Sequence, residues 1–224
     1  MTPVRRFSRT IRLRLARKKV ERTLEAATLR AFRQGWPRLY RSVRRLRKQD
    51  GEAWWEDWER EFEQALLAAF EQGAETFGGV EAAWYANAGR QVTFSSQAIL
   101  QTAGVGERIK RIADDTRAWT RKAIQAWYTT DAGLPELVEV LRKEFSARRA
   151  RLIAITETTF MASSTADYMM AQAGLDRWTW QTRKDDIVCD YCFIMHGTVW
   201  TRRDPAPPDA SHPGCRCGKA PLIE

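Results

Sequence analysis

The stretch that decides the fold lies near the C-terminus, where residues 185–217 read DDIVCDYCFIMHGTVWTRRDPAPPDASHPGCRC. It holds all four cysteines and both histidines of the 224-residue chain. A C-x2-C pair is followed about twenty residues later by H-x2-C-x-C, and this spacing is typical of a zinc site. No thiol or imidazole precedes this stretch, so chemistry that needs soft metal ligands is confined to it.

The cluster offers five ligands for the four positions of a tetrahedral ion. The candidates are Cys189, Cys192, His212, Cys215 and Cys217. Either all four cysteines bind Zn²⁺, or His212 replaces Cys215 beside Cys217, and the spacing does not decide between these sets. A pair of disulfides, a redox-active C-x-x-C and an unmetallated turn cluster are the alternatives. We expect a structural zinc ion that staples a loop-rich tail with few apolar residues of its own.

A catalytic role for the same stretch is the less favoured interpretation. Nucleases of the HNH type combine zinc knuckles with histidines near a Pro-rich loop, but this chain has only His196 and His212. Asp185 and Asp186 carry carboxylates that bind Mg²⁺ in other proteins, although adjacent acids at a turn are more typical of solvated or capping residues. No Gly-rich phosphate loop, Ser/His/Asp set or dinucleotide fingerprint is present. We expect a non-enzyme, with a zinc-dependent nuclease as the alternative.

The charge of the chain is distributed unevenly. Residues 1–48 hold 17 Lys and Arg against two acidic residues, a net charge of +15, while the whole chain has a net charge of +9. A basic N-terminal segment predicts a polyanion partner, most simply nucleic acid, with an acidic protein or lipid headgroups as alternatives. No apolar run approaches the roughly 20 residues that span a membrane, and no secretory signal is evident, so a reducing compartment is expected.

The partner expected for this segment is double-stranded DNA, bound without sequence preference through its phosphates. Between residues 5 and 22 the basic side chains surround the predicted helix, which favours either a solvated arm or an arm that becomes ordered on its partner. The residues predicted to contact nucleic acid are Arg5, Arg6, Arg9, Arg12, Arg14, Arg17, Lys18, Lys19, Arg22, Arg41, Arg44, Arg45, Arg47 and Lys48.

Hydrophobic periodicity predicts a mainly α fold with a small α+β tail. Gly35-Trp36-Pro37 and Gly78-Gly79 are expected to end helices. Basic residues 37–48 are expected to pack beside acidic residues 52–63. Helices are expected over 4–34, 37–48, 52–77, 84–85 with their neighbours, 107–128, 135–145 and 147–173, short strands over 177–182 and 197–200, and an irregular loop over 202–213. We divide the chain into a basic helical arm (1–50), a helical region (51–103) and a C-terminal region (104–224).

The C-terminal region resembles the phage head morphogenesis domain, also called the Mu protein F-like minor head protein family. Residues 112–137 resemble its helix, glycine turn and helix, and residues 148–158 (RRARLIAITET) its R-A-x-x-I-A-R-T-E-T segment. Residues 180–186 are similar to its W-x-T-x-x-D-x-R lead-in to C-x-x-C, and residues 197–199 to its G-K-V. Residues 212–217 (HPGCRC) match its H-P-N-C-R-C close.

This resemblance implies a minor head protein of a tailed phage or a phage-like particle. Such a protein lies in the virion interior, after passing through the host cytoplasm during assembly, and acts in head assembly and in DNA packaging or delivery. The implied protein partners are the portal, the major capsid protein or both. The alternative to a virion protein is a general nucleic-acid-binding zinc module.

Overall fold

The computed structural model describes residues 3–45, 53–130, 132–182, 188–201, 204 and 212–223. Helices dominate these residues, and the expectation of a mainly α fold with a small α+β tail is confirmed. The elements in chain order are α1 (Pro3–Arg45), α2 (Ala53–Asn87), α3 (Ser96–Thr102), α4 (Val105–Tyr128), α5 (Leu134–Glu144), α6 (Ala147–Gln172), β1 (Arg177–Gln181), α7 (Asp190–Met195), β2 (Val199–Thr201) and β3 (Gly218–Pro221).

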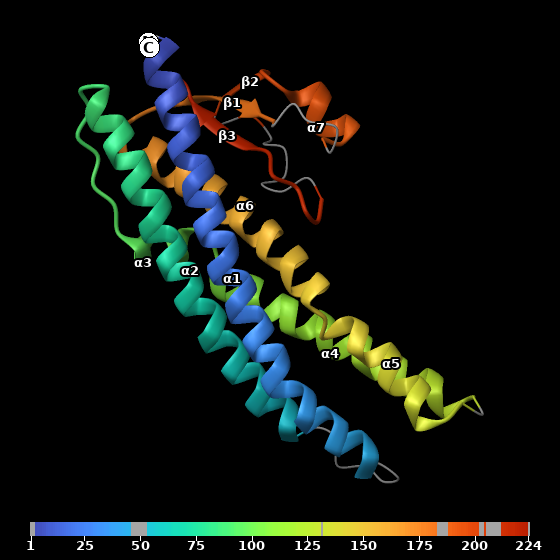
Figure 1. Ribbon diagram of the computed structural model, residues 1–224. Coiled ribbons are helices and arrows are strands. Elements are labelled where there is room, and N and C mark those ends of the chain that lie inside the picture. Colours follow the sequence, from blue (N-terminus) through green and yellow to red (C-terminus); the bar gives the residue numbers. More distant parts are fainter. Residues whose placement is uncertain are drawn as a thin grey trace.

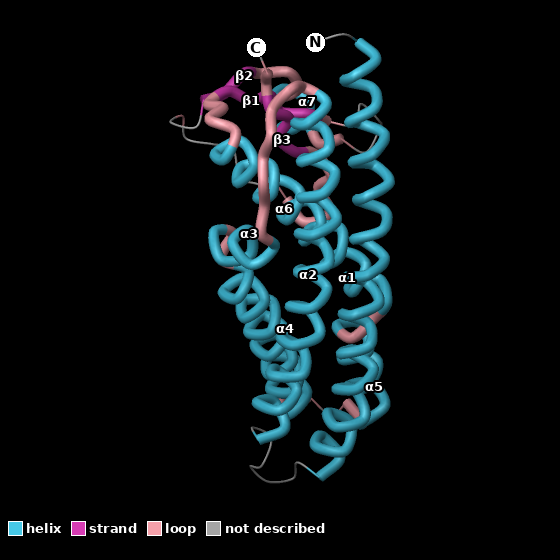
Figure 2. The backbone as a smooth tube through the Cα atoms, turned by 90° about the vertical axis from the view of Figure 1, so that its left-hand side faces the viewer, coloured by secondary structure: helices cyan, strands magenta, loops and turns pink. Residues whose placement is uncertain are grey.

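The long helices pack side by side, with the small sheet at one end of them (Figure 1). α1 packs against α2 and α6, and α2 also packs against α4. Viewed from the side, α3 and α4 lie on one side of α2 and α1 lies on the other (Figure 2). None of the helices that the structure describes combines the length and the apolar character needed to cross a membrane.

The first helix is part of the core, so of the two alternatives for residues 5–22 the solvated arm does not fit the described ones. Ala16, Val20, Leu24 and Phe32 are all buried and follow one another at intervals of four or eight residues. Such residues form one apolar stripe on a helix. The sequence obscures only the start of this stripe, because Ala16 is a small residue within the run of charged residues.

The predicted aromatic stripe of α2 is confirmed as core. Its side chains lie within the cluster that α1 and α6 share. The fully or almost fully buried members are Trp58, Phe62, Leu66, Phe70 and Phe77. The expected pairing of basic and acidic helix ends is seen in Arg38, whose Nη1 lies 2.9 Å from Oε1 of Glu61.

The helix boundary expected at Gly35-Trp36-Pro37 is wrong, because α1 continues through it to Arg45. Gly35 lies against the indole of Trp58, and a Cβ at this position would overlap the ring. The same indole is fully buried and donates from Nε1 to the carbonyl of Ala31 at 3.1 Å. Gly35 therefore permits a close approach of two helices and does not end one.

The break expected at Gly78-Gly79 is also wrong, because α2 runs through both residues to Asn87. A Cβ on Gly78 would overlap the ring of Phe94, whereas a Cβ on Gly79 would meet nothing within 4 Å. Gly78 is thus a second position where the helix makes room for an aromatic ring.

The three-stranded antiparallel sheet has the order β2-β1-β3. Trp178 of the central strand pairs with Trp200 on one side and with Pro221 on the other. Trp178 and Trp180 alternate with more exposed residues and are buried in a second apolar cluster with Met169 of α6. The strand expected over 177–182 is confirmed, while β3 and α7 have no counterpart in the prediction.

The two kinds of helical glycine give a prediction for stability. Gly35→Ala should lower the free energy of unfolding by about 1–3 kcal/mol, because the new methyl group must displace a buried indole. Gly79→Ala, at an exposed helical position with open space, should raise it by about 0.5–1 kcal/mol. Urea unfolding followed by circular dichroism measures both changes. Equal effects of the two substitutions would contradict the packing argument.

Candidate metal centre and nucleic-acid interface

The first half of the cysteine cluster forms at the start of α7. Cys189 is the N-cap residue of this helix, with φ −68° and ψ 156°. Its Sγ accepts the backbone N–H of Cys192 at 3.5 Å. Cys189 is half-buried and Cys192 fully buried. The C-x2-C spacing thus places two sulfur atoms in a single turn, as a metal knuckle requires.

The second half forms in the turn before β3. The backbone N–H of Cys215 donates to the carbonyl of His212 at 3.1 Å. Gly214 occupies the left-handed region of this turn, with φ +83°, which a side chain rarely permits. Cys215 and Cys217 are 2% and 4% exposed, so both thiols face the interior of the tail.

The structure brings all five predicted ligands into two overlapping groups. Ligand atoms of Cys189, Cys192 and His212 lie within 4.8 Å of one another. The same holds for Cys192, Cys215 and Cys217. Cys192 therefore belongs to both groups, and the other four candidates surround it.

The sulfur spacing fits a metal better than a disulfide. The Sγ atoms of Cys192 and Cys215 are 3.7 Å apart. Thiolates on a tetrahedral Zn²⁺, at about 2.3 Å from the ion, stand about 3.8 Å from each other, whereas disulfide sulfurs are bonded at about 2.05 Å. The four cysteines are not joined by disulfides in this structure.

The electrostatics of the cluster also fit a cation. A hydrogen bond with Cys215, followed by burial and the charges of the neighbouring thiols, raises the pKa of Cys217 well above that of an ordinary thiol. A divalent ion reverses this preference, because it stabilises the thiolates that crowd around it. A hydrogen bond to the Pro213 carbonyl, 2.9 Å from Nδ1, is the main cause that raises the pKa of His212. This contact orients the ring and leaves Nε2 as the nitrogen for a metal.

Helix α6 holds the turn of the second half in place. The hydroxyl of Thr156 accepts the backbone N–H of Gly214 at 2.8 Å. The hydroxyl of Thr159 donates to the carbonyl of Cys215 at 2.5 Å. Thr156 lies within residues 148–158, the segment that resembles the R-A-x-x-I-A-R-T-E-T motif, and Thr159 follows that segment directly.

Helix α1 holds the same turn from the other side. The guanidinium of Arg216 forms a two-pronged contact with the carboxylate of Glu21, at 3.1 and 3.3 Å. Arg17 in turn donates to the carbonyl of Arg216. The turn that carries Cys215 and Cys217 is therefore bound to the first helix, nearly 200 positions earlier in the chain.

The second histidine stands apart from the metal cluster. Nδ1 of His196 accepts the backbone N–H of Thr182 at 3.1 Å. In the neutral ring the proton is then on Nε2, so the free nitrogen is a donor and not a general base. Asp185 and Asp186, the other residues of the nuclease interpretation, lie outside the described residues.

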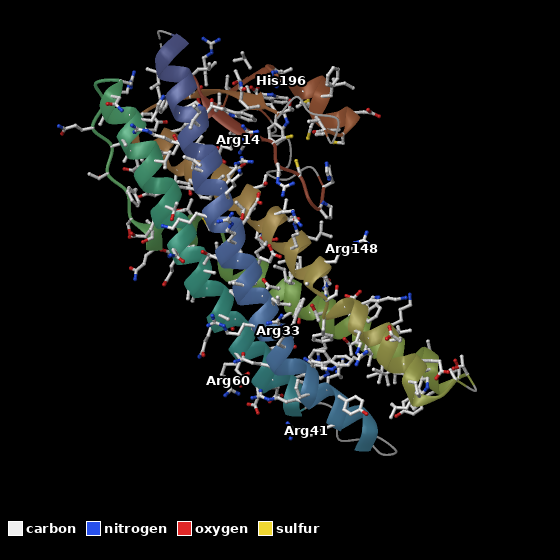
Figure 3. All side chains as sticks on the ribbon, viewed as in Figure 1. Arg14, Arg33, Arg41, Arg60, Arg148 and His196 are labelled. Carbon is white, nitrogen blue, oxygen red and sulfur yellow. The ribbon has the colours of Figure 1, made fainter. Side chains whose placement is uncertain are left out.

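A second candidate site is the solvent face of α1. Seven exposed basic residues of this helix have no partner in the described chain, and Figure 3 labels Arg14 and Arg33 among them. Five belong to the predicted set and two, Arg30 and Arg33, do not. The seven residues are Arg12, Arg14, Lys18, Lys19, Arg22, Arg30 and Arg33. Arg30 and Arg33 were missed because they stand outside dense runs of charge, although their helical spacing from Arg22 and Arg41 indicates the shared face.

Of the other predicted nucleic-acid contacts, three have hydrogen-bond or ion-pair partners within the chain and six lie outside the described side chains. Arg9 is 9% exposed, pairs with Glu81 at 2.5 Å and stacks on Trp84, so it faces inward and is removed from the predicted surface. Arg17 donates a hydrogen bond to the carbonyl of Arg216 in the C-terminal turn. Arg41 is exposed, and its Nε donates to the carbonyl of Pro37. The predicted side chains that lie outside the described ones are Arg5, Arg6, Arg44, Arg45, Arg47 and Lys48.

Comparison with known proteins identifies the family. The chain matches no curated protein and no solved structure at a significant level. The family model described as Phage Mu protein F like protein matches residues 96–220, which is more than half of the chain. The matched part includes α4, α6, β1, β2 and the whole cysteine cluster, and it ends within β3. The chain therefore belongs to the Phage Mu protein F like family of phage head morphogenesis proteins.

Proposed function

We propose that the protein is a minor head protein of the virion interior that contacts packaged DNA through α1 and docks on the portal or the capsid shell. It acts in head assembly and in the packaging or delivery of DNA. The family supports the particle and the capsid-related partners. The observation that carries the DNA contact is the set of seven exposed basic residues without partners that share the solvent face of α1.

This basic face is long enough to follow a duplex. From Arg12 to Arg41 the helix rises by about 44 Å at 1.5 Å per residue. That length corresponds to about 13 base pairs of DNA at 3.4 Å per pair. Both acidic residues of α1 are half-buried, and Glu21 is already paired with Arg216. Contacts of this kind are made to phosphates, so the binding carries no sequence preference.

We propose that the cysteine cluster holds one structural Zn²⁺. The tail after α6 has a short sheet and a six-residue helix, which bury few side chains by themselves. A site with protein ligands for every tetrahedral position leaves none for water, so the ion would stabilise the fold and would not perform hydrolysis. This supports a non-enzymatic role.

The proposed DNA contact predicts a specific change in salt dependence. Arg30→Ala combined with Arg33→Ala should weaken duplex DNA binding and lower the slope of log K against log salt by about 2, since each lost phosphate contact removes about 0.9. Fluorescence anisotropy of a labelled duplex over a salt series measures both. Removal of residues 1–48 is not a clean test, because α1 contributes core side chains.

The matched control changes the same number of charges on another helix. Arg111→Ala combined with Lys122→Ala removes two exposed cations from α4 and should leave the slope close to that of the unchanged protein. If both double variants reduced the slope equally, the binding would reflect net charge alone and the assignment to α1 would fail.

The metal proposal predicts about one zinc per purified chain by elemental analysis. Cys192→Ser should abolish it, because Cys192 lies in both ligand groups. His196→Ala is the matched control, since it removes the histidine outside the cluster and should retain the metal. A chain that purifies without metal and with oxidised thiols would instead support disulfides.

The choice of the fourth ligand follows from the same measurement. If the four cysteines bind the ion, His212→Ala should keep its zinc and Cys215→Ser should lose it, whereas with His212 in place of Cys215 the two results are exchanged. Retention in both variants, or loss in both, would contradict both of these ligand sets.

A further inference from the structure

A groove lies between α2, α3 and the N-terminal half of α4, with a volume of about 590 Å³. Its lining includes the buried side chains Val105, Ile109 and Ala113 of α4. It lies on the α3 and α4 side of the molecule, away from α1 (Figure 2). The groove thus has no part in the metal centre or in the basic face.

The rim of this groove is acidic. Glu63, Glu107 and Asp114 are exposed, and within the described chain none of the three has an ion-pair or hydrogen-bond partner. Glu59 also lines the groove, but it pairs with Arg117 at 3.3 Å. Lys110 is the basic residue of the lining. A surface complementary to this groove would present apolar side chains bordered by several cations.

The exposed side of α1 presents such a surface. Ile11 and Leu15 are 42% and 62% exposed and stand one helical turn apart. Exposed basic residues border them, among them Arg14 and Lys18, which lack partners in the described chain. We refer to residues 11–18 as the α1 ridge.

We propose that the groove of one chain binds the α1 ridge of a second copy. The groove is lined by α2, α3 and α4, whereas the ridge belongs to α1 on the other side of α2 (Figure 2), so the proposed contact forms between copies. A contact between two different surfaces is head-to-tail, and repetition of it builds a ring or an open chain of subunits. The charges on the two surfaces are opposite, so the contact weakens as salt screens them.

The ridge overlaps the N-terminal part of the face proposed for DNA. Arg14 and Lys18 therefore take part in either contact but not in both at once. Duplex DNA and the groove of a second copy compete for the same helix, and added duplex should dissociate the assembly.

Sedimentation of the full chain at low salt, over a range of concentrations, tests the proposal. The unchanged protein should show a mass that rises with concentration above that of one 25.8 kDa chain. A ridge variant with Arg14→Glu and Lys18→Glu should remain monomeric, and so should a groove variant with Glu63→Lys and Asp114→Lys. All four positions are exposed, so circular dichroism should show the unchanged fold.

A mixture of the two variants gives the sharpest result. The ridge variant keeps an intact groove and the groove variant keeps an intact ridge, so one contact forms between them. The mixture should associate one to one and stop at two chains, because neither partner can extend the assembly. A control variant with Glu71→Lys and Asp176→Lys, both exposed and outside the groove, should associate like the unchanged protein.

The proposal is overturned if the unchanged chain is monomeric at the highest soluble concentration at low salt. It is also overturned if the mixture stays monomeric, or if either variant associates like the unchanged protein. The variant with Arg30→Ala and Arg33→Ala keeps ridge and groove and should still associate. Loss of DNA binding without loss of association, or the reverse, therefore separates this proposal from the proposed DNA contact.

Discussion

The structure depends on the burial of α6, whose central part is enclosed by other elements and still carries polar side chains. Glu157 is almost fully buried, and this burial raises its pKa. The charge and hydrogen bond of the Arg108 guanidinium partly offset the increase. Arg108 also covers the ring of Phe160, with its Cζ 4.0 Å from the centroid. Removal of Arg108 would leave the carboxylate of Glu157 buried without its partner, which is costly. The ion pair and the cation–π contact of Arg108 therefore hold α4 in position against α6.

Polar side chains of α6 also hold the turn of the candidate metal centre. The hydroxyls of Thr156 and Thr159 find their partners in the backbone of the turn that carries Cys215. Arg216, between two candidate ligands, pairs with Glu21 of α1. Because this inner side of α1 is used by the core and by the C-terminal turn, the remaining cations share the opposite side. The basic face is thus a consequence of how α1 is held.

The sequence predicts the parts of this fold whose signals are local. The helix over 147–173 matches α6 closely, because Ser146 caps its start and Gly174, with φ +65°, follows its end. The five metal candidates were found by spacing, which also explains why the choice among them stays open. Sequence reasoning fails at Gly35 and Gly78, because a glycine that makes room for a distant ring looks like one that ends a helix. Strand β3 (GKAP) has little β propensity, so its pairing with β1 is a tertiary effect.

The contact between Arg216 and Glu21 joins positions separated by 195 residues, and this separation has a consequence for how the fold is completed. Closing such a long loop costs conformational entropy before the contact contributes anything. An ion held by the proposed ligands would remove part of that cost, since it would fix the turn around Cys215 that contacts α1 and α6. Because such an ion would bind the folded turn and not the extended chain, its binding free energy would add to the stability of the folded state. Through Arg216 and Arg17 the same free energy would support the docking of α1. The candidate metal centre and the basic face, at distant places in the sequence, are therefore joined through a single short turn.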